Sequence, residues 1–292
     1  MTLILLPGSG LAWYPTQADH SFLPPGNPAP VVGSNQVYTI RPNDSLVDLA
    51  YRVGVGYESM VNANPGVDPW MPSKGLKVLI PYQTILPPNP VPGIVINIAE
   101  FRLYYTWRES GRLRVRIYPL GIGREGWDTP VGRFAIASKI RNPTWMVPES
   151  IRNERPGQPT MVPPGPENPL GGYWLGLSIK GYGIHGTHRP LGVGRRVSHG
   201  CMRLYPQDID DLFSRVEVKT PVNIVFQPVK VGLRENKLWA EIHPDTRDQP
   251  VNMVNEIIRM RTMLEWEGKI DWPKVWREMD RKSGIPFVIS SP

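Results

Sequence analysis

Proline and glycine occur along the whole chain and limit how much helix it can form. They account for 34 and 28 of its 292 residues, about 21% together against about 12% in an average protein. Because proline lacks a backbone N–H and glycine weakens the interior of a helix, we expect strands, turns and loops to dominate. The sequence therefore predicts a mainly β fold. No apolar run approaches the roughly 18 residues of a membrane-spanning helix, so no transmembrane segment is predicted.

Charge and cysteine content exclude several classes of protein. The chain has 33 Lys and Arg against 26 Asp and Glu, but the basic residues are dispersed, so we expect no nucleic-acid partner. Cys201 is the only cysteine, which excludes an internal disulfide framework and a zinc site built from several thiolates. The apolar run in residues 1–13 lacks basic residues and is cut short by proline and glycine. We therefore expect the true export signal to lie outside this numbering.

Changes in composition divide the chain into segments. Residues 1–35 are rich in proline and predict an extended arm or linker. Residues 36–82 have the pattern strand, helix, helix, strand, and residues 93–227 predict a mostly β domain. Within that domain, residues 141–172 are too long for an ordinary connection and indicate a lid. Residues 228–292 predict a C-terminal extension of one hairpin followed by two helices.

The residues most informative about chemistry lie between His185 and Arg203. This glycine-rich stretch holds three of the five histidines, the only cysteine and an arginine. A cysteine nucleophile needs a nearby base or positive charge to become a thiolate, and histidine provides both. Sequence spacing alone does not choose between His185 and His199 as that base. On an extended strand, His199, Cys201 and Arg203 would share one face and could hold a substrate carboxylate.

Two other interpretations of this stretch remain open. Cys201 could be a small buried apolar residue, as free cysteines often are. Alternatively, His185, His188, His199 and Cys201 could bind zinc. The flexible glycine spacing and the neighbouring Arg203 favour thiolate chemistry over a closed metal site.

Three motifs resemble those of one enzyme family. IHGT at residues 184–187 and SHGCMRL at residues 198–204 resemble the active-site signature of the YkuD-type L,D-transpeptidases. LGIGREGWDTPVGRFAIASK at residues 120–139 is similar to the same family. The resemblance spans about residues 93–227, and it implies a β-sandwich-like catalytic domain that needs no metal or organic cofactor.

The resemblance also implies a mechanism. Cys201 would attack the carbonyl between meso-diaminopimelate and the terminal D-Ala of a peptidoglycan tetrapeptide stem, with His185 as general base. An acceptor amine would then resolve the thioester, which gives a 3→3 crosslink or attaches an outer-membrane lipoprotein. His199 would shape the substrate channel, and the backbone N–H groups of Gly200 and Cys201 would form an oxyanion hole. Further residues expected at the substrate are Ser198, Arg203, Gly186, Thr187, Trp145 and Tyr173.

A second resemblance covers residues 36–82. The segments YTIRPNDSLVDLA, NANP and GLKVLIP resemble the LysM module, a small βααβ unit that binds the glycan of peptidoglycan or chitin. Glycan contacts are expected from the loop residues Asn43, Asp44, Asn62 and Asn64. The two resemblances together imply a periplasmic enzyme, and removal of residues 36–82 is expected to weaken binding to sacculi but spare turnover of soluble fragments.

Two alternative functions use the same features. An L,D-carboxypeptidase would use the same cysteine and histidine but pass the thioester to water, so that only the product distinguishes it. A non-catalytic wall-binding protein would use only the LysM-like segment. The histidines, Cys201 and Arg203 argue against this last alternative, because a scaffold has no physical need for them.

Overall fold

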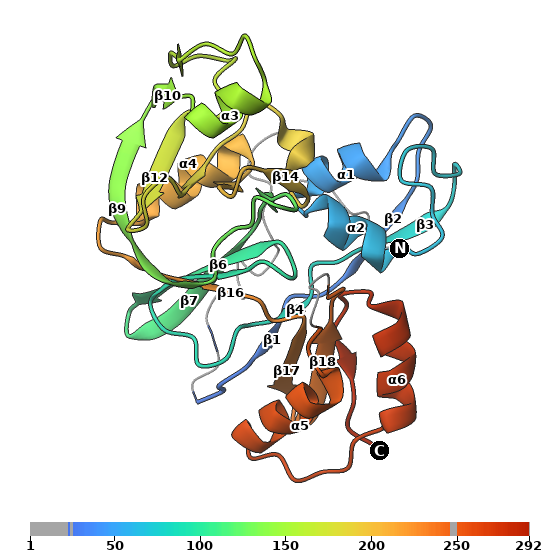
Figure 1. Cartoon of the computed structure of the whole chain (residues 1–292). Helices are drawn as coiled ribbons and strands as arrows, with labels where there is room; N and C mark the ends of the chain where they lie inside the picture. The colour runs from blue at the N-terminus through green and yellow to red at the C-terminus, as the bar shows by residue number, and fades with distance from the viewer. Residues whose placement is uncertain (1–22, 24–25, 246–249, 292) are drawn as a thin grey trace.

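A curled mixed sheet of eight strands forms the centre of the molecule (Figure 1). The computed structural model describes Leu23 and residues 26–245 and 250–291. Strands dominate these residues and helices are few, which confirms the mainly β prediction. In sheet order the strands are β15 (Met202–Arg203), β13 (Gly183–His185), β12 (Tyr173–Leu177), β9 (Gly132–Arg141), β16 (Pro221–Val225), β5 (Gly93–Asn97), β6 (Arg102–Glu109) and β7 (Arg112–Pro119).

Local sequence explains how this sheet forms. β5 and β16 are apolar and pair in parallel at its middle, and β13 also pairs with β15 in parallel. β6 and β7 form a hairpin whose two turn residues, Ser110 and Gly111, both have positive φ, as a tight hairpin turn requires. The helix α4 (Pro206–Arg215) buries Ile209 and Leu212 in the sheet's core. The sheet and this helix together position the strands that carry the catalytic motif.

Residues 36–82, called the N-terminal unit below, have the predicted order of elements. β2 (Gln36–Thr39) and β3 (Lys77–Ile80) pair antiparallel. Between them in the sequence come α1 (Leu46–Val53) and α2 (Tyr57–Ala63). The Ser45 hydroxyl caps α1 by accepting the Asp48 N–H at 3.0 Å, and Gly54 ends that helix in the left-handed conformation. The apolar face of α1 is buried in the core of the unit.

Short elements lie next to Cys201 and in residues 141–172, the segment called the lid below. β8 (Ile122–Gly123) pairs in parallel with β14 (Arg196–Ser198), and η2 (Pro190–Gly192) precedes β14. The segment expected to be a lid contains a small antiparallel pair and one short helix, which Figure 1 shows above the sheet. Its elements are β10 (Trp145–Met146), α3 (Glu149–Glu154) and β11 (Met161–Val162).

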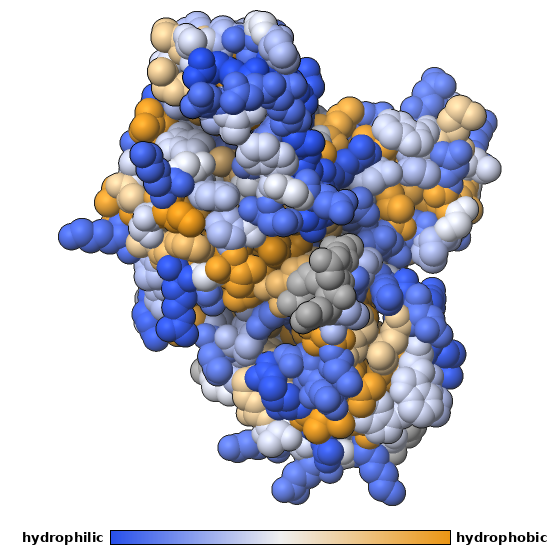
Figure 2. All heavy atoms as spheres, viewed as in Figure 1, coloured by the Kyte–Doolittle hydropathy of each residue, from blue (hydrophilic) through white to orange (hydrophobic). Residues whose placement is uncertain are grey.

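The C-terminal residues form a unit of their own beside the sheet. β17 (Val229–Arg234) and β18 (Lys237–Ile242) form a hairpin, and β19 (Phe287–Val288) adds to β18. The helices α5 (Met253–Met263) and α6 (Trp272–Arg281) contribute to a separate apolar core. Figure 2 shows apolar side chains gathered across the middle of the view, between the central sheet and this unit. No helix among the described residues has the length and apolar character needed to cross a membrane.

The end of the predicted arm is packed into the protein. The segment examined for an export signal, and most of residues 1–35, lie outside the described residues. β1 (Val31–Val32) pairs with β4 (Thr84–Ile85), and the carbonyl of Ala29 accepts the Leu233 N–H at 2.9 Å. Residues 29–32 are buried. This part of the predicted arm or linker is thus packed between β4 and the C-terminal unit.

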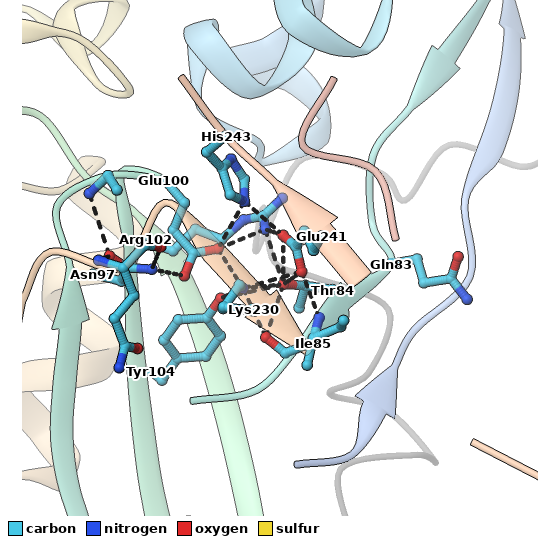
Figure 3. Close-up of polar contacts among 12 residues, drawn as sticks. Gln83, Thr84, Ile85, Asn97, Glu100, Arg102, Tyr104, Lys230, Glu241 and His243 are labelled. Carbon is cyan, nitrogen blue, oxygen red and sulfur yellow. Dashed lines mark hydrogen bonds and ion pairs between the residues drawn. The ribbon is translucent and has the colours of Figure 1, made fainter. Parts of the chain in front are cut away.

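A buried ion network links the C-terminal unit to the central sheet (Figure 3). Arg102 on β6 binds Glu241 on β18 at 2.6 Å and Glu100 at 2.9 Å. Lys230 on β17 binds Glu100 at 2.6 Å and Glu241 at 3.1 Å. All four side chains are at most 2% exposed. Burial acts to raise the pKa of Glu241, but Lys230 and Arg102 lower it well below its usual range.

One part of this network has the composition of a metal site. Among the described residues, Glu100, Glu241 and His243 form the only group of potential metal ligands whose atoms lie close together, within 4.8 Å. Both carboxylates already bind Arg102 and Lys230, and His243 Nε2 lies 2.9 Å from Glu241 Oε1. Two fixed cations therefore balance the two carboxylates, and we assign no metal to this group.

We expect Glu241→Gln to lower the free energy of unfolding by about 3–5 kcal/mol, because it leaves Arg102 and Lys230 buried without full compensation. Because the folded-state pKa of Glu241 is lowered, its contribution is fully present above the ordinary carboxyl value of 4.5 and is lost as the pH falls below it. Urea unfolding from pH 2 to 8 measures this. The exposed Glu267→Gln is the control, and equal stabilities of the two variants at pH 7 would contradict the prediction.

Candidate active site

Cys201 lies on a tight bend between β14 and β15. Gly200 has φ +98°, and a Cβ there would lie 2.6 Å from the Tyr182 ring, so the bend requires glycine. The Ser198 hydroxyl accepts the Gly200 N–H at 3.1 Å and donates to the Cys201 carbonyl at 2.5 Å. The Thr129 hydroxyl donates to the Gly200 carbonyl at 2.9 Å. The expectation of one extended row of His199, Cys201 and Arg203 is therefore wrong, because the chain turns at Gly200.

The thiol opens into a cavity of about 310 Å³ under the lid. Cys201, His185, His199, Arg203 and Ser198 all line it, as the sequence predicted. Trp145 of the lid also lines it, which agrees with its expected place in the pocket wall. The rest of the wall is mostly apolar and includes Met146, Pro148, Ile151, Leu170 and Trp174. The site thus combines a few polar groups with an apolar cover, as ligand sites commonly do.

The environment of Cys201 favours a protonated thiol. Its Sγ donates to the Gly181 carbonyl at 3.5 Å. Burial raises the pKa of the Cys201 thiol, while the Gly183 backbone and the charge of Arg203 act in the opposite direction. Because burial dominates, Cys201 is at rest a thiol rather than a thiolate.

His185 is a neutral ring on the strand beside the thiol. It is 3% exposed and lies opposite Trp174 across the β12–β13 pair, with ring centroids 5.7 Å apart. Its Nδ1 lies 2.7 Å from the Gly186 carbonyl, which can only accept, so Nδ1 carries the proton. Burial, with the charge of Arg203, lowers the pKa of His185 to about 3. The neutral ring therefore keeps a lone pair on Nε2 and can accept a proton.

Arg203 supplies a buried positive charge. It lies on β15 directly beside His185 on β13. Burial lowers the pKa of Arg203, yet guanidinium remains charged in proteins. Its Nε is buried and has no hydrogen-bond partner among the described residues. A cation with an unsatisfied donor at the cavity wall is suited to bind a carboxylate.

His199 is tied to the lid. Its Nε2 lies 2.9 Å from Glu154 on α3 and 3.1 Å from Arg124. The Trp127 ring meets it edge-on at 4.8 Å. Glu154 also pairs with Arg124, and the hydrogen bond from His199 is the main cause that lowers the pKa of Glu154. This geometry favours a role in holding the lid rather than in activating the thiol.

Several predicted residues do not reach the cavity. Tyr173 packs against Phe213 at 4.7 Å, and its neighbour Trp174 lines the cavity instead, because adjacent strand residues face opposite sides. Gly186 and Thr187 are buried behind the site, where the Thr187 hydroxyl accepts the Arg189 N–H at 3.0 Å. The N–H of Gly200 is already bonded to Ser198, so it is not a free oxyanion donor.

The four histidine and cysteine residues considered as zinc ligands do not come together. No three of His185, His188, His199 and Cys201 place their ligand atoms within 4.8 Å of one another, since the only such group among the described residues contains none of them. His199 instead binds Glu154 and Arg124. The geometry therefore favours thiolate chemistry over zinc binding at this site.

Two of the four residues predicted to contact glycan, Asp44 and Asn64, form hydrogen bonds within the N-terminal unit. Asn64 is buried, its amide donates to the carbonyls of Met60 and Leu79, and its oxygen accepts the Leu79 N–H at 2.7 Å. Asp44 accepts from Tyr38, Arg52 and the Arg41 N–H. The expectation that these two side chains contact glycan is therefore wrong. Asn43 is exposed and Asn62 is half-buried.

Comparisons with known proteins identify the family. The model of the YkuD L,D-transpeptidase catalytic domain matches residues 92–224. The solved catalytic domain of an Enterococcus faecium L,D-transpeptidase is 24% identical, with a TM-score of 0.36, over 46% of this chain and 97% of that one. The Escherichia coli K12 protein named "Probable L,D-transpeptidase YcfS" is 37% identical over 94% of this chain and 89% of its own length. "Probable L,D-transpeptidase YbiS" of the same strain is 40% identical over 79% and 74%.

The extent of these sequence matches shows that the chain belongs to the YkuD family of L,D-transpeptidases. It is an L,D-transpeptidase, and enzymes of this family act on peptidoglycan.

The raised thiol pKa predicts how Cys201 reacts with iodoacetamide in the free enzyme. Because only the thiolate reacts, the alkylation rate should keep rising through pH 9 and show no plateau between pH 5 and 8. Intact mass follows the labelling, and Cys201→Ser is the blank. A rate that levels off below pH 7 would reveal a resting thiolate–imidazolium pair and contradict the assignment.

Proposed function

We propose that Cys201 is the nucleophile of the transpeptidase and that His185 is its general base. The observation that carries the proposal is that the thiol and a neutral, buried imidazole line one lid-covered cavity. Sγ attacks the carbonyl between meso-diaminopimelate and the terminal D-Ala of a tetrapeptide stem. The thiol proton passes to Nε2 of His185 and then to the nitrogen of D-Ala, which leaves as the free amino acid.

The proton moves during attack rather than before it. With the pKa of the thiol raised and that of His185 lowered to about 3, a resting ion pair between them is unfavourable. Negative charge passes from sulfur to the carbonyl oxygen as the tetrahedral intermediate forms. The Gly200 N–H is already engaged, so we assign the Cys201 N–H as the oxyanion donor on this bend.

An amine acceptor fits the cavity better than water. Trp145, Met146 and Ile151 of the lid line the same cavity as the thiol, and an apolar cover limits hydrolysis of a thioester. The acceptor is the side-chain amine of a second stem, which gives a 3→3 crosslink, or the lysine amine of an outer-membrane lipoprotein. The L,D-carboxypeptidase alternative has no feature of the site in its favour.

We further propose that the N-terminal unit is a LysM module and that the enzyme works in the periplasm. The βααβ order and the sequence landmarks support the module. Asn43 and Asn62 remain as its glycan-binding candidates. The cell-wall-acting family and its Escherichia coli relatives support a periplasmic location.

Release of D-Ala from a disaccharide-tetrapeptide tests the catalytic roles. Cys201→Ala should release none, and His185→Gln should lower kcat by about 100-fold or more. Both variants are first checked for a wild-type melting profile. D-Ala release by folded Cys201→Ala at the wild-type rate would rule out the proposed mechanism.

Arg203 is proposed to bind a carboxylate of the donor stem. We expect Arg203→Gln to raise KM by about 10- to 100-fold, as expected for loss of a hydrogen bond between charged groups. A donor whose C-terminal carboxylate is amidated should show little difference between wild type and variant. The exposed Arg277→Gln on α6 is the matched control. If amidation changes the KM of wild type and Arg203→Gln equally, Arg203 does not bind that carboxylate.

A further inference from the structure

The chain contacts the N-terminal unit on both sides of Cys201, through Arg195 before it and Tyr205 after it. Arg195 lies six residues before Cys201 and Tyr205 four residues after it, and each contacts residues 51–58. We propose that the N-terminal unit is a positioning part of the active site and that Arg195 and Tyr205 are positioning residues for the thiol. The inference rests on the proposed role of Cys201.

Before Cys201, the start of α2 is bonded to the backbone that precedes β14. The Tyr57 N–H donates to the Val193 carbonyl at 3.3 Å, and the Glu58 N–H donates to the Gly194 carbonyl at 3.2 Å. Gly56 gives α2 no side-chain cap, so these carbonyls satisfy donors that every helix start leaves unpaired. Gly194 has φ +82°, and a Cβ there would lie 2.2 Å from the Tyr57 nitrogen. No other residue fits this contact.

The Arg195 side chain extends this contact into the N-terminal unit. Its guanidinium carbon lies 3.5 Å from the centre of the Tyr57 ring and 5.7 Å from that of Trp70. Two of its nitrogens are buried without a hydrogen-bond partner among the described residues, so the aromatic faces hold the cation. The Arg195 carbonyl accepts the Ile122 N–H at 2.9 Å, where β8 meets β14. Arg195 therefore couples α2 directly to the strand before Cys201.

On the other side of Cys201, Tyr205 contacts the N-terminal unit. Its hydroxyl donates to the Val55 carbonyl at 3.0 Å, and its ring lies 5.0 Å from that of Tyr51. It is 1% exposed and follows β15, which carries Arg203. The bend at Gly200 therefore lies between two anchors on one rigid unit. A shift of that unit moves both approaches to the thiol together.

This arrangement changes the expected result of deleting residues 36–82. The deletion would remove the partners of both anchors, so it would lower turnover of soluble fragments as well as binding to sacculi. It also means that a glycan bound to the N-terminal unit is held in a fixed position relative to Cys201.

Substituting Tyr205→Phe tests the inference, with Tyr105→Phe as the matched control. Tyr105 also donates its hydroxyl to a backbone carbonyl, that of Arg215 at 3.1 Å, but it does not touch the junction. We expect Tyr205→Phe to lower kcat on a soluble disaccharide-tetrapeptide about tenfold with KM unchanged, because small misplacements of a reacting group are costly. Tyr105→Phe should leave both constants unchanged.

The pH profile of Cys201 alkylation gives an independent readout. Burial is the main cause of the raised thiol pKa, so a loosened segment should move the profile toward lower pH. Arg195→Gln should show the same shift and the same loss of kcat. Wild-type kcat and profile in folded Tyr205→Phe and Arg195→Gln would overturn the inference. Absence of D-Ala release by the wild type would instead refute the proposed function, while the alkylation profiles would still decide the positioning role.

Discussion

The bend at Gly200 is the constraint on which the active site depends. It turns the chain so that the Cys201 thiol lines the cavity while His199 binds Glu154 of the lid. Only glycine fits at this position, because a Cβ would collide with the Tyr182 ring. The hydroxyls of Ser198 and Thr129 form hydrogen bonds with the backbone of Gly200 and stabilise the bend. The N-terminal unit contacts the chain on both sides of the bend, at Arg195 and at Tyr205. The ion network around Glu241 links the C-terminal unit to the sheet. The protein thus places one reactive sulfur by joining three regions of the chain.

Electrostatics determine when that sulfur reacts. Burial keeps the thiol protonated and His185 neutral, while Arg203 is a nearby permanent cation. A resting thiol is protected from oxidation and alkylation, because the thiolate is the reactive form. Substrate binding then supplies the carbonyl to which the charge is transferred. In the proposed mechanism, the apolar lid, which is bound to His199 through Glu154, preserves the thioester for an amine.

The fold class and the family could be predicted from the sequence more reliably than individual side-chain contacts. Proline and glycine content predicted the mainly β fold, and the motifs around His185 and Cys201 indicated the family. The family resemblance implied Tyr173 at the pocket wall, but Trp174 lies there, because the resemblance does not say which face of the strand is turned to the cavity. The loop position of Asn64 did not reveal that the backbone uses its amide. The Tyr205 hydroxyl bonds to a carbonyl 150 residues away, and no local pattern indicates such a contact.

The most direct test of the central claim is intact-protein mass spectrometry of the wild type mixed with a disaccharide-tetrapeptide and quenched in acid. The account predicts a covalent adduct on Cys201 with the mass of the donor minus D-Ala, which disappears when an acceptor amine is added and crosslinked product forms. Free D-Ala and crosslinked product without any adduct on Cys201, across the quench times of the reaction, would contradict it.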